Sequence, residues 1–188
     1  MATEKSQPYP LIDHCSDVVA AADLAWGKLA DKHPQLLALW QGDAKQELHT
    51  MLGLSDFISA SLVQDSTLLE WLLDQYQHCG DIDYRLLLSQ QLAQVTDEMG
   101  LMRSLRHFRR RYMTLIAWQD FSHRAPLQHS LASLSQLAEA LIMEAYHWLY
   151  QQCCTEWGIP MNDQGEPQPM LILGMGKLGG GELNFSSD

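Results

Sequence analysis

Apolar residues recur at intervals of three and four along residues 17–157, and few prolines interrupt this pattern. Such spacing gathers apolar side chains on one face of an α-helix, which has about 3.6 residues per turn. Ser55 and Ser66 are suited to begin helices, and Gly53 to end the helix before Ser55. The pattern therefore predicts a succession of helices, and we place a mainly α-helical region at residues 1–160.

Three of the predicted helices lie in the second half of this region. A helix over residues 83–99 is expected to end at Gly100. An arginine-rich helix follows over residues 101–121, and a long helix over residues 127–157 is expected to end at Gly158. We expect the last two helices to pack against each other as an antiparallel hairpin.

Residues 161–169, with the sequence MNDQGEPQP, are the predicted boundary between two domains. Glycine and proline disfavour a helix there, so we interpret this stretch as a linker loop. Residues 170–188 then begin a second domain, and the apolar residues 170–173 are a predicted β-strand. The expected fold class is thus a helical region followed by the truncated start of an α/β domain.

The charge of the chain restricts its partners. Its formal net charge of −11 argues against nonspecific nucleic-acid binding, which requires a basic surface. A run of about 18 apolar residues would be needed to span a membrane, and none occurs. We expect neither nucleic acid nor membrane as a partner.

Cysteines and histidines give no metal-binding pattern. Cys15, Cys79, Cys153 and Cys154 have no C-x-x-C spacing, so reduced thiols in the cytoplasm are the preferred interpretation. The eight histidines form no pair with metal-ligand spacing. The Asp-Ile-Asp run at 81–83 follows a glycine, and we interpret its carboxylates as helix-start residues that complement the helix dipole.

The most informative segment for chemistry is residues 170–188, MLILGMGKLGGGELNFSSD. Its glycines allow a backbone to approach a phosphate closely, because a β-carbon there would block the turn or the ligand. A nicotinamide-dependent oxidoreductase is one alternative, since residues 174–179 match G-x-G-x-x-G. That fingerprint requires a helix directly after the glycines, and two further glycines stand there instead. A Walker loop is disfavoured because leucine follows Lys177.

A third interpretation is a nucleotidyltransferase domain, in which a glycine turn binds phosphates and aspartates hold two magnesium ions. The run GMGKLGGGELNFSSD closely resembles the signature of the bacterial glutamine synthetase adenylyltransferase/adenylyl-removing enzymes. The arginine-rich run at residues 103–120 resembles the helix that precedes the catalytic domain in that family.

The resemblance implies a bifunctional enzyme that controls nitrogen assimilation. One domain attaches AMP from ATP to a tyrosine of glutamine synthetase, and the other removes it by phosphorolysis, which yields ADP. Its place in the chain suggests that this is the adenylyl-removing domain. Glutamine synthetase and a PII signalling protein are the implied partners, with Mg²⁺ as cofactor and ATP, ADP or inorganic phosphate as substrates.

The resemblance also implies roles for individual residues. Asp188 is the expected catalytic residue and magnesium ligand, and the residues expected to contact nucleotide or phosphate are Gly176, Lys177, Gly179, Gly180 and Ser187. The other two metal carboxylates of such domains would lie beyond residue 188. We therefore expect these 188 residues alone to be inactive.

Five of the seven arginines fall within residues 103–111. Arg103, Arg106 and Arg110 would lie on neighbouring turns of one helix and could bind a nucleotide, inorganic phosphate or an acidic partner. The alternative is a solvated face that the chain's own carboxylates neutralise. A purely helical interaction module, in which the glycine-rich segment has no role, is the remaining functional alternative.

Overall fold

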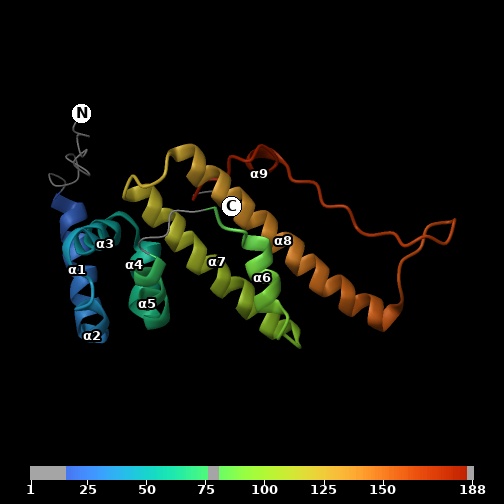
Figure 1. The fold of residues 1–188 in the computed structure, drawn as a ribbon, viewed down its shortest axis with the longest axis horizontal. Helices are drawn as coiled ribbons and strands as arrows, with labels where there is room; N and C mark the ends of the chain where they lie inside the picture. The colour runs from blue at the N-terminus through green and yellow to red at the C-terminus, as the bar shows by residue number, and fades with distance from the viewer. Residues whose placement is uncertain (1–15, 76–80, 186–188) are drawn as a thin grey trace. The chain divides into compact units, whose positions relative to one another are not determined.

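The computed structural model describes residues 16–75 and 81–185, and these residues are mainly helical (Figure 1). The helices are α1 (Ser16–Lys32), α2 (Pro34–Leu37), α3 (Gly42–Leu54), α4 (Asp56–Gln64), α5 (Ser66–Gln75), α6 (Tyr84–Leu92), α7 (Glu98–Phe121), α8 (Leu127–Trp157) and α9 (Gly176–Gly179). Over the described ranges, β-structure is limited to an isolated bridge between Met161 and Pro167. None of the helices in these ranges is both long and apolar enough to cross a membrane.

The chain divides into two compact units. The first comprises Met1–Gly80 and Thr114–Pro126, so it takes in α1 to α5 and the end of α7. Its core consists of buried side chains from these helices, among them Leu29, Leu48, Leu62, Leu69 and Trp118, and of Trp40 in the connection between α2 and α3. The predicted helical periodicity therefore corresponds to a packed apolar interior.

Two helix ends in the first unit differ in detail from the sequence prediction. Gly53 does not end a helix but lies within α3, where a β-carbon would collide with the carbonyl oxygen of Val18 in α1. Its role is therefore close helix packing. Ser55 caps α4 as predicted and accepts a 3.3 Å hydrogen bond from the Ile58 amide. Asp65, and not Ser66, accepts bonds from the first amides of α5.

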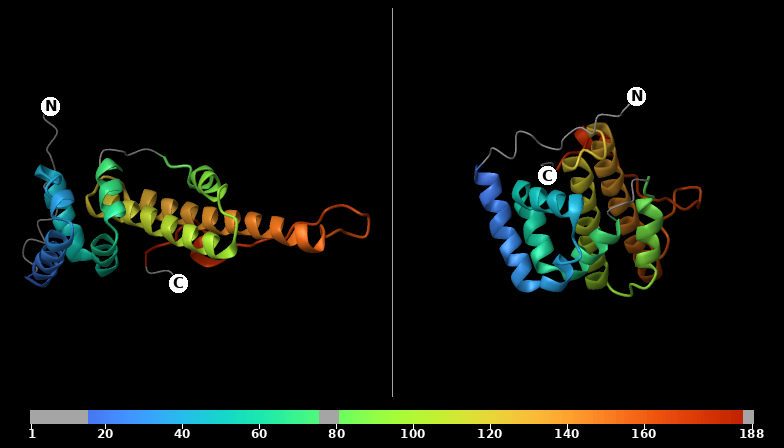
Figure 2. Two further views of the ribbon diagram at one scale, coloured as in Figure 1. Left: turned by 90° about the horizontal axis from the view of Figure 1, so that it is seen from below. Right: turned by 60° about the vertical axis from the view of Figure 1, so that its left-hand side comes forward.

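The second unit comprises Asp81–Met113 and Leu127–Asp188. Here α6 packs on α8, and Arg85 in α6 forms a 2.9 Å ion pair with Glu144 in α8. Residues 98–113 of α7 lie beside α8 and run in the opposite direction, as the expected hairpin requires (Figures 1 and 2). The ring of Tyr84 in α6 contacts the ring of Tyr112 in α7, which in turn contacts the ring of Phe108.

The helix predicted over residues 83–99 is wrong in its extent. Asp83 does begin a helix and caps α6, but α6 ends at Leu92. A new helix, α7, starts at Glu98 and continues through Gly100. The reason is a side-chain cap, because the Asp97 carboxylate accepts a 2.6 Å hydrogen bond from the Gly100 amide and so begins the helix. The bounds of α8, Leu127–Trp157, agree with the prediction.

After α8 the chain makes a compact turn. The side-chain oxygen of Asn162 accepts hydrogen bonds from the amides of Gln164 and Glu166, and the Asn162 amide bonds to the Glu166 carbonyl. Residues 170–173, predicted as a β-strand, form no strand here and are exposed. A strand requires hydrogen bonds to a neighbouring strand, and no described segment pairs with these residues.

Candidate functional site

The glycine-rich segment, residues 170–185, contains a compact turn at residues 174–181, which we call the glycine turn. Its centre is α9, a single helical turn over Gly176–Gly179. Backbone hydrogen bonds close the turn: Gly180 donates to the carbonyl of Gly176 at 3.0 Å, and Glu182 donates to that of Lys177 at 2.8 Å. The local sequence therefore folds back on itself without a partner strand.

Two glycines approach each other across this turn. A β-carbon on Gly179 would collide with the carbonyl oxygen of Gly174, so residue 179 must be glycine for the turn to close. A β-carbon on Gly180, in contrast, would lie 3.5 Å from the nearest atom, the carbonyl oxygen of Gly176. The steric requirement therefore differs between these neighbouring glycines.

The same bonds determine which groups of the turn can meet a ligand. The amides of Gly179 and Gly180 donate to carbonyls within the turn. Gly176 and Lys177 stand at the first turn of α9, where amides have no helical acceptor. Lys177 is exposed, so its ammonium group adds a positive charge beside these amides. This arrangement suits an anionic group such as a phosphate.

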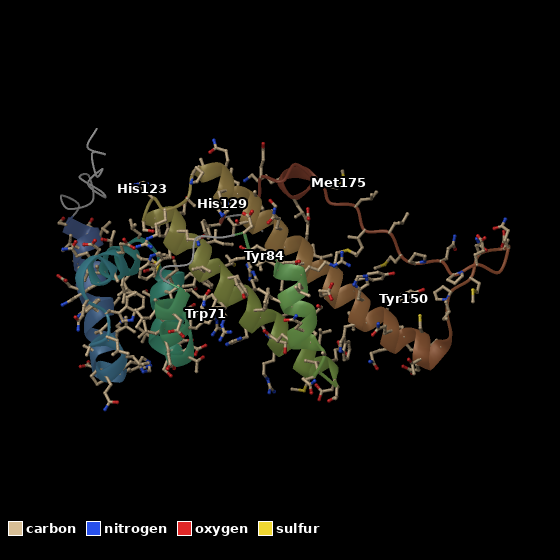
Figure 3. The ribbon with its side chains drawn as sticks, viewed as in Figure 1. Trp71, Tyr84, His123, His129, Tyr150 and Met175 are labelled. Atoms are coloured by element: carbon tan, nitrogen blue, oxygen red, sulfur yellow. The ribbon has the colours of Figure 1, made fainter. Side chains whose placement is uncertain are left out.

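Hydrogen bonds join the glycine-rich segment to α8 on both sides of the glycine turn. The Met170 amide donates to the Tyr146 hydroxyl at 3.1 Å, and the Leu183 amide donates to Ser135 Oγ at 3.0 Å. Figure 3 shows Met175 on the segment and Tyr150 on α8. The sequence predicted no contact with the glycine turn for Ser135 or Tyr146. One available signal was the run of serines at 130, 133 and 135, which are buried in a helix that otherwise buries apolar side chains.

The arginines lie on α7, in the part that belongs to the second unit. Arg103 and Arg106 are exposed, whereas Arg110 is half-buried. Their spacing of three and four places them along one face of the helix. Arg85, on α6 of the same unit, forms an ion pair with Glu144.

The expected metal ligand Asp188 and the neighbouring Ser187 lie outside the described residues. Within the described ranges, no group of three or more His, Cys, Asp or Glu side chains is placed to hold a metal ion. The dinucleotide interpretation is not supported, because the helix after the first glycines spans only Gly176–Gly179.

Comparison with known proteins covers most of the chain. The family model described as glutamate-ammonia ligase adenylyltransferase matches residues 45–188, which include the arginine-rich helix and the glycine turn. A protein from Vibrio parahaemolyticus, named bifunctional glutamine synthetase adenylyltransferase/adenylyl-removing enzyme, is 49% identical over 153 residues. That match covers 81% of this chain and 16% of the relative, so the chain spans about a sixth of the relative's length.

Proposed function

The chain belongs to the glutamate-ammonia ligase adenylyltransferase family, and we propose that its complete protein attaches AMP to glutamate-ammonia ligase and removes it. Glutamate-ammonia ligase is the enzyme also called glutamine synthetase. The observation that carries the proposal is the family match over residues 45–188, which extends through the glycine turn. We assign this region to the adenylyl-removing reaction, in which phosphate displaces a protein tyrosine from AMP and releases ADP.

The glycine turn supports a phosphate-binding role. Gly176 and Lys177 present amides and one ammonium group at an exposed turn, and Gly179 allows the backbone to close around it. In transfer of a nucleotidyl group, the protein mainly positions the reactants and neutralises developing charge. Gly180 and Ser187 complete the set of residues proposed to contact nucleotide or phosphate.

We also propose Mg²⁺ as a cofactor, with Asp188 as one of its ligands and a catalytic residue. Magnesium supplies charge neutralisation at the phosphate oxygens when it is bound. The described residues hold no cluster that fits this ion, so magnesium enters the proposal through the chemistry of nucleotide transfer alone. Residues 1–188 by themselves are proposed to be inactive.

The arginines of α7 are proposed as contacts for an anion or for the protein partner. Exposed guanidinium groups at positions 103 and 106 are available to phosphate or to carboxylates. A PII signalling protein is proposed as a second partner on the family resemblance. The cysteine pattern supports a cytoplasmic location for the complete protein.

The direct test uses the complete protein with purified glutamine synthetase. With ATP it should incorporate adenylate into glutamine synthetase, and with inorganic phosphate it should release ADP from the adenylylated form. Both reactions should require magnesium. The absence of both transfers under these conditions would overturn the proposed function.

A further inference from the structure

We propose that α8 holds the glycine turn in its binding position through Ser135 and Tyr146, which act as positioning residues. The inference rests on the proposed function for its link to nucleotide and phosphate. Its structural part rests on the hydrogen bonds from Leu183 to Ser135 and from Met170 to Tyr146, which we call the two anchor bonds. They flank the glycine turn on both sides along the chain.

The geometry of the segment shows what the anchor bonds do. Ser135 and Tyr146 are eleven positions apart on one helix, which corresponds to about 16 Å along its axis. The fourteen residues from Met170 to Leu183 could extend over roughly 45 Å. The segment therefore returns along α8 with excess length, and the glycine turn takes up that excess (Figures 1 and 2).

Ser135 is well suited to hold a backbone amide. Its side chain is buried, with 3% exposure, and its hydroxyl donates a 2.9 Å hydrogen bond to the Leu131 carbonyl of the same helix. This hydrogen bond fixes the rotation of the Ser135 hydroxyl group, so the lone pairs of its oxygen face away from the helix backbone. The Leu183 amide reaches that oxygen at 3.0 Å. The Ser135 hydroxyl therefore bonds both its own helix, as a donor, and the glycine-rich segment, as an acceptor.

Tyr146 holds the other end of the segment in a more exposed place. Its ring is half-buried and lies 5.4 Å from the ring of Tyr150, centroid to centroid. Its hydroxyl oxygen accepts a hydrogen bond from the amide of Met170, the residue just before the apolar residues 171–173. Without the bond at Met170, the exposed residues 170–175 would form a less constrained stretch of chain before the turn. Such a chain orders its amides on a phosphate at a larger entropy cost.

The test uses the complete protein with Ser135→Ala and, separately, Tyr146→Phe. Each change removes one acceptor and leaves the helix backbone intact. Thr155→Ala and Tyr150→Phe are matched controls. Thr155 makes the same type of bond to a carbonyl four residues earlier, and Tyr150 lies one turn after Tyr146 on the same helix.

Hydrogen–deuterium exchange reports the positioning without any substrate. In both anchor variants, exchange of the amides in residues 174–183 should become about threefold to tenfold faster, as expected for loss of one hydrogen bond. Exchange of α8 and of the control variants should not change. Equal exchange of this segment in anchor and control variants would overturn the positioning role.

Kinetics tests the link to the reaction. The KM for phosphate in the adenylyl-removing reaction should rise about threefold to tenfold in each anchor variant, while kcat changes less than about twofold. Faster exchange with an unchanged KM would overturn the claim that the anchors set ligand affinity. A wild-type protein without transfer activity would instead remove the proposed function, and the exchange result would still decide the positioning role.

Discussion

The indole Nε1–H of Trp118 donates a 2.9 Å hydrogen bond to the carboxylate of Glu47. The other oxygen of the same carboxylate accepts a 3.1 Å bond from Arg124, so one side chain of α3 satisfies two groups near the end of α7. The Trp118 ring also packs on Trp40, with 5.0 Å between ring centroids. Both tryptophans lie in the core of the first unit, and Glu47 and Arg124 lie half-buried at its edge.

Glu47→Ala should therefore destabilise the first unit by about 2 to 4 kcal/mol, because it leaves a buried indole N–H and a mostly buried guanidinium without this acceptor. Glu47→Gln should cost less, since an amide oxygen can still accept from Trp118. Asp23→Asn is the control, because its 2.8 Å pair with His49 is exposed and should change stability by less than about 0.5 kcal/mol. Urea unfolding measures all three. Equal losses for Ala and Gln would contradict the account.

A matched pair of glycine substitutions tests the glycine turn. In the complete protein, Gly179→Ala should raise the KM for phosphate at least about tenfold, because its β-carbon would collide with the Gly174 carbonyl. Gly180→Ala should raise the KM less than Gly179→Ala, since its β-carbon would make only an ordinary contact within the turn and would affect only the proposed contact with the ligand. Steady-state kinetics with both variants provides the comparison. Similar KM values for the two would show that closure of the turn does not matter for binding.

The sequence predicted the helices well where caps and periodicity agree. The bounds of α8 follow from a long apolar stripe that ends at Gly158. Gly53 and Gly100 were interpreted as helix stops, but both lie within helices. The close approach of Gly53 to Val18 joins residues that only the folded chain brings near, whereas the Asp97 cap lies three residues before Gly100 and is a local signal. A glycine alone does not distinguish a stop from a packing position.

The candidate site was predictable only in part. Motif resemblance identified the glycine turn, because glycine spacing is a local property of the chain. Ser135 and Tyr146 were not predicted, since they meet the segment across 48 and 24 positions of sequence. The strand predicted at residues 170–173 does not form, because a strand requires hydrogen bonds from a partner strand, which local sequence does not supply.

The arginines of α7 give a salt-dependent prediction. The double change Arg103→Ala and Arg106→Ala should weaken phosphate, ATP or glutamine synthetase binding about threefold to tenfold at low salt. Both side chains are exposed, so the unfolding free energy should change little. The difference from wild type should shrink as added salt screens the charges. Arg85→Ala, which removes the ion pair with Glu144, is the control. Identical kinetics of the double variant and wild type at low salt would show that these arginines form only a solvated face and bind no partner or ligand.

Tyr84 predicts a loss of stability at high pH. Burial raises the pKa of its hydroxyl to about 12, although a hydrogen bond with Ser133 lowers it and Tyr112 raises it further. The folded protein therefore keeps this proton between about pH 10 and 12, where the unfolded chain releases it. Since the folded state then binds more protons, its stability is complete below about pH 10 and falls by up to about 3 kcal/mol as pH rises to 12.

Tyr84→Phe separates this effect from other groups that titrate at high pH. The variant should lose about 1 kcal/mol near neutral pH, because the bond with Ser133 is gone. Its stability should then decline less steeply than that of wild type above pH 10. Urea unfolding at a series of pH values measures the difference. Parallel pH profiles would mean that Tyr84 does not carry the change.

Asp188 gives the most direct test of the adenylyl-removing assignment. A carboxylate that binds magnesium cannot be replaced by an amide without losing charge at the phosphate. In the complete protein, Asp188→Asn should reduce phosphate-dependent release of ADP from adenylylated glutamine synthetase at least about a hundredfold, since even residues that support a metal ligand contribute about tenfold to a hundredfold.

The control is Asp163→Asn, in the exposed turn after α8, which should leave this rate unchanged. ATP-dependent attachment of AMP should survive in both variants, because we propose that a second catalytic domain performs it. Residues 1–188 alone should release no ADP. Full activity of Asp188→Asn, or turnover by residues 1–188, would show that Asp188 is not a metal ligand.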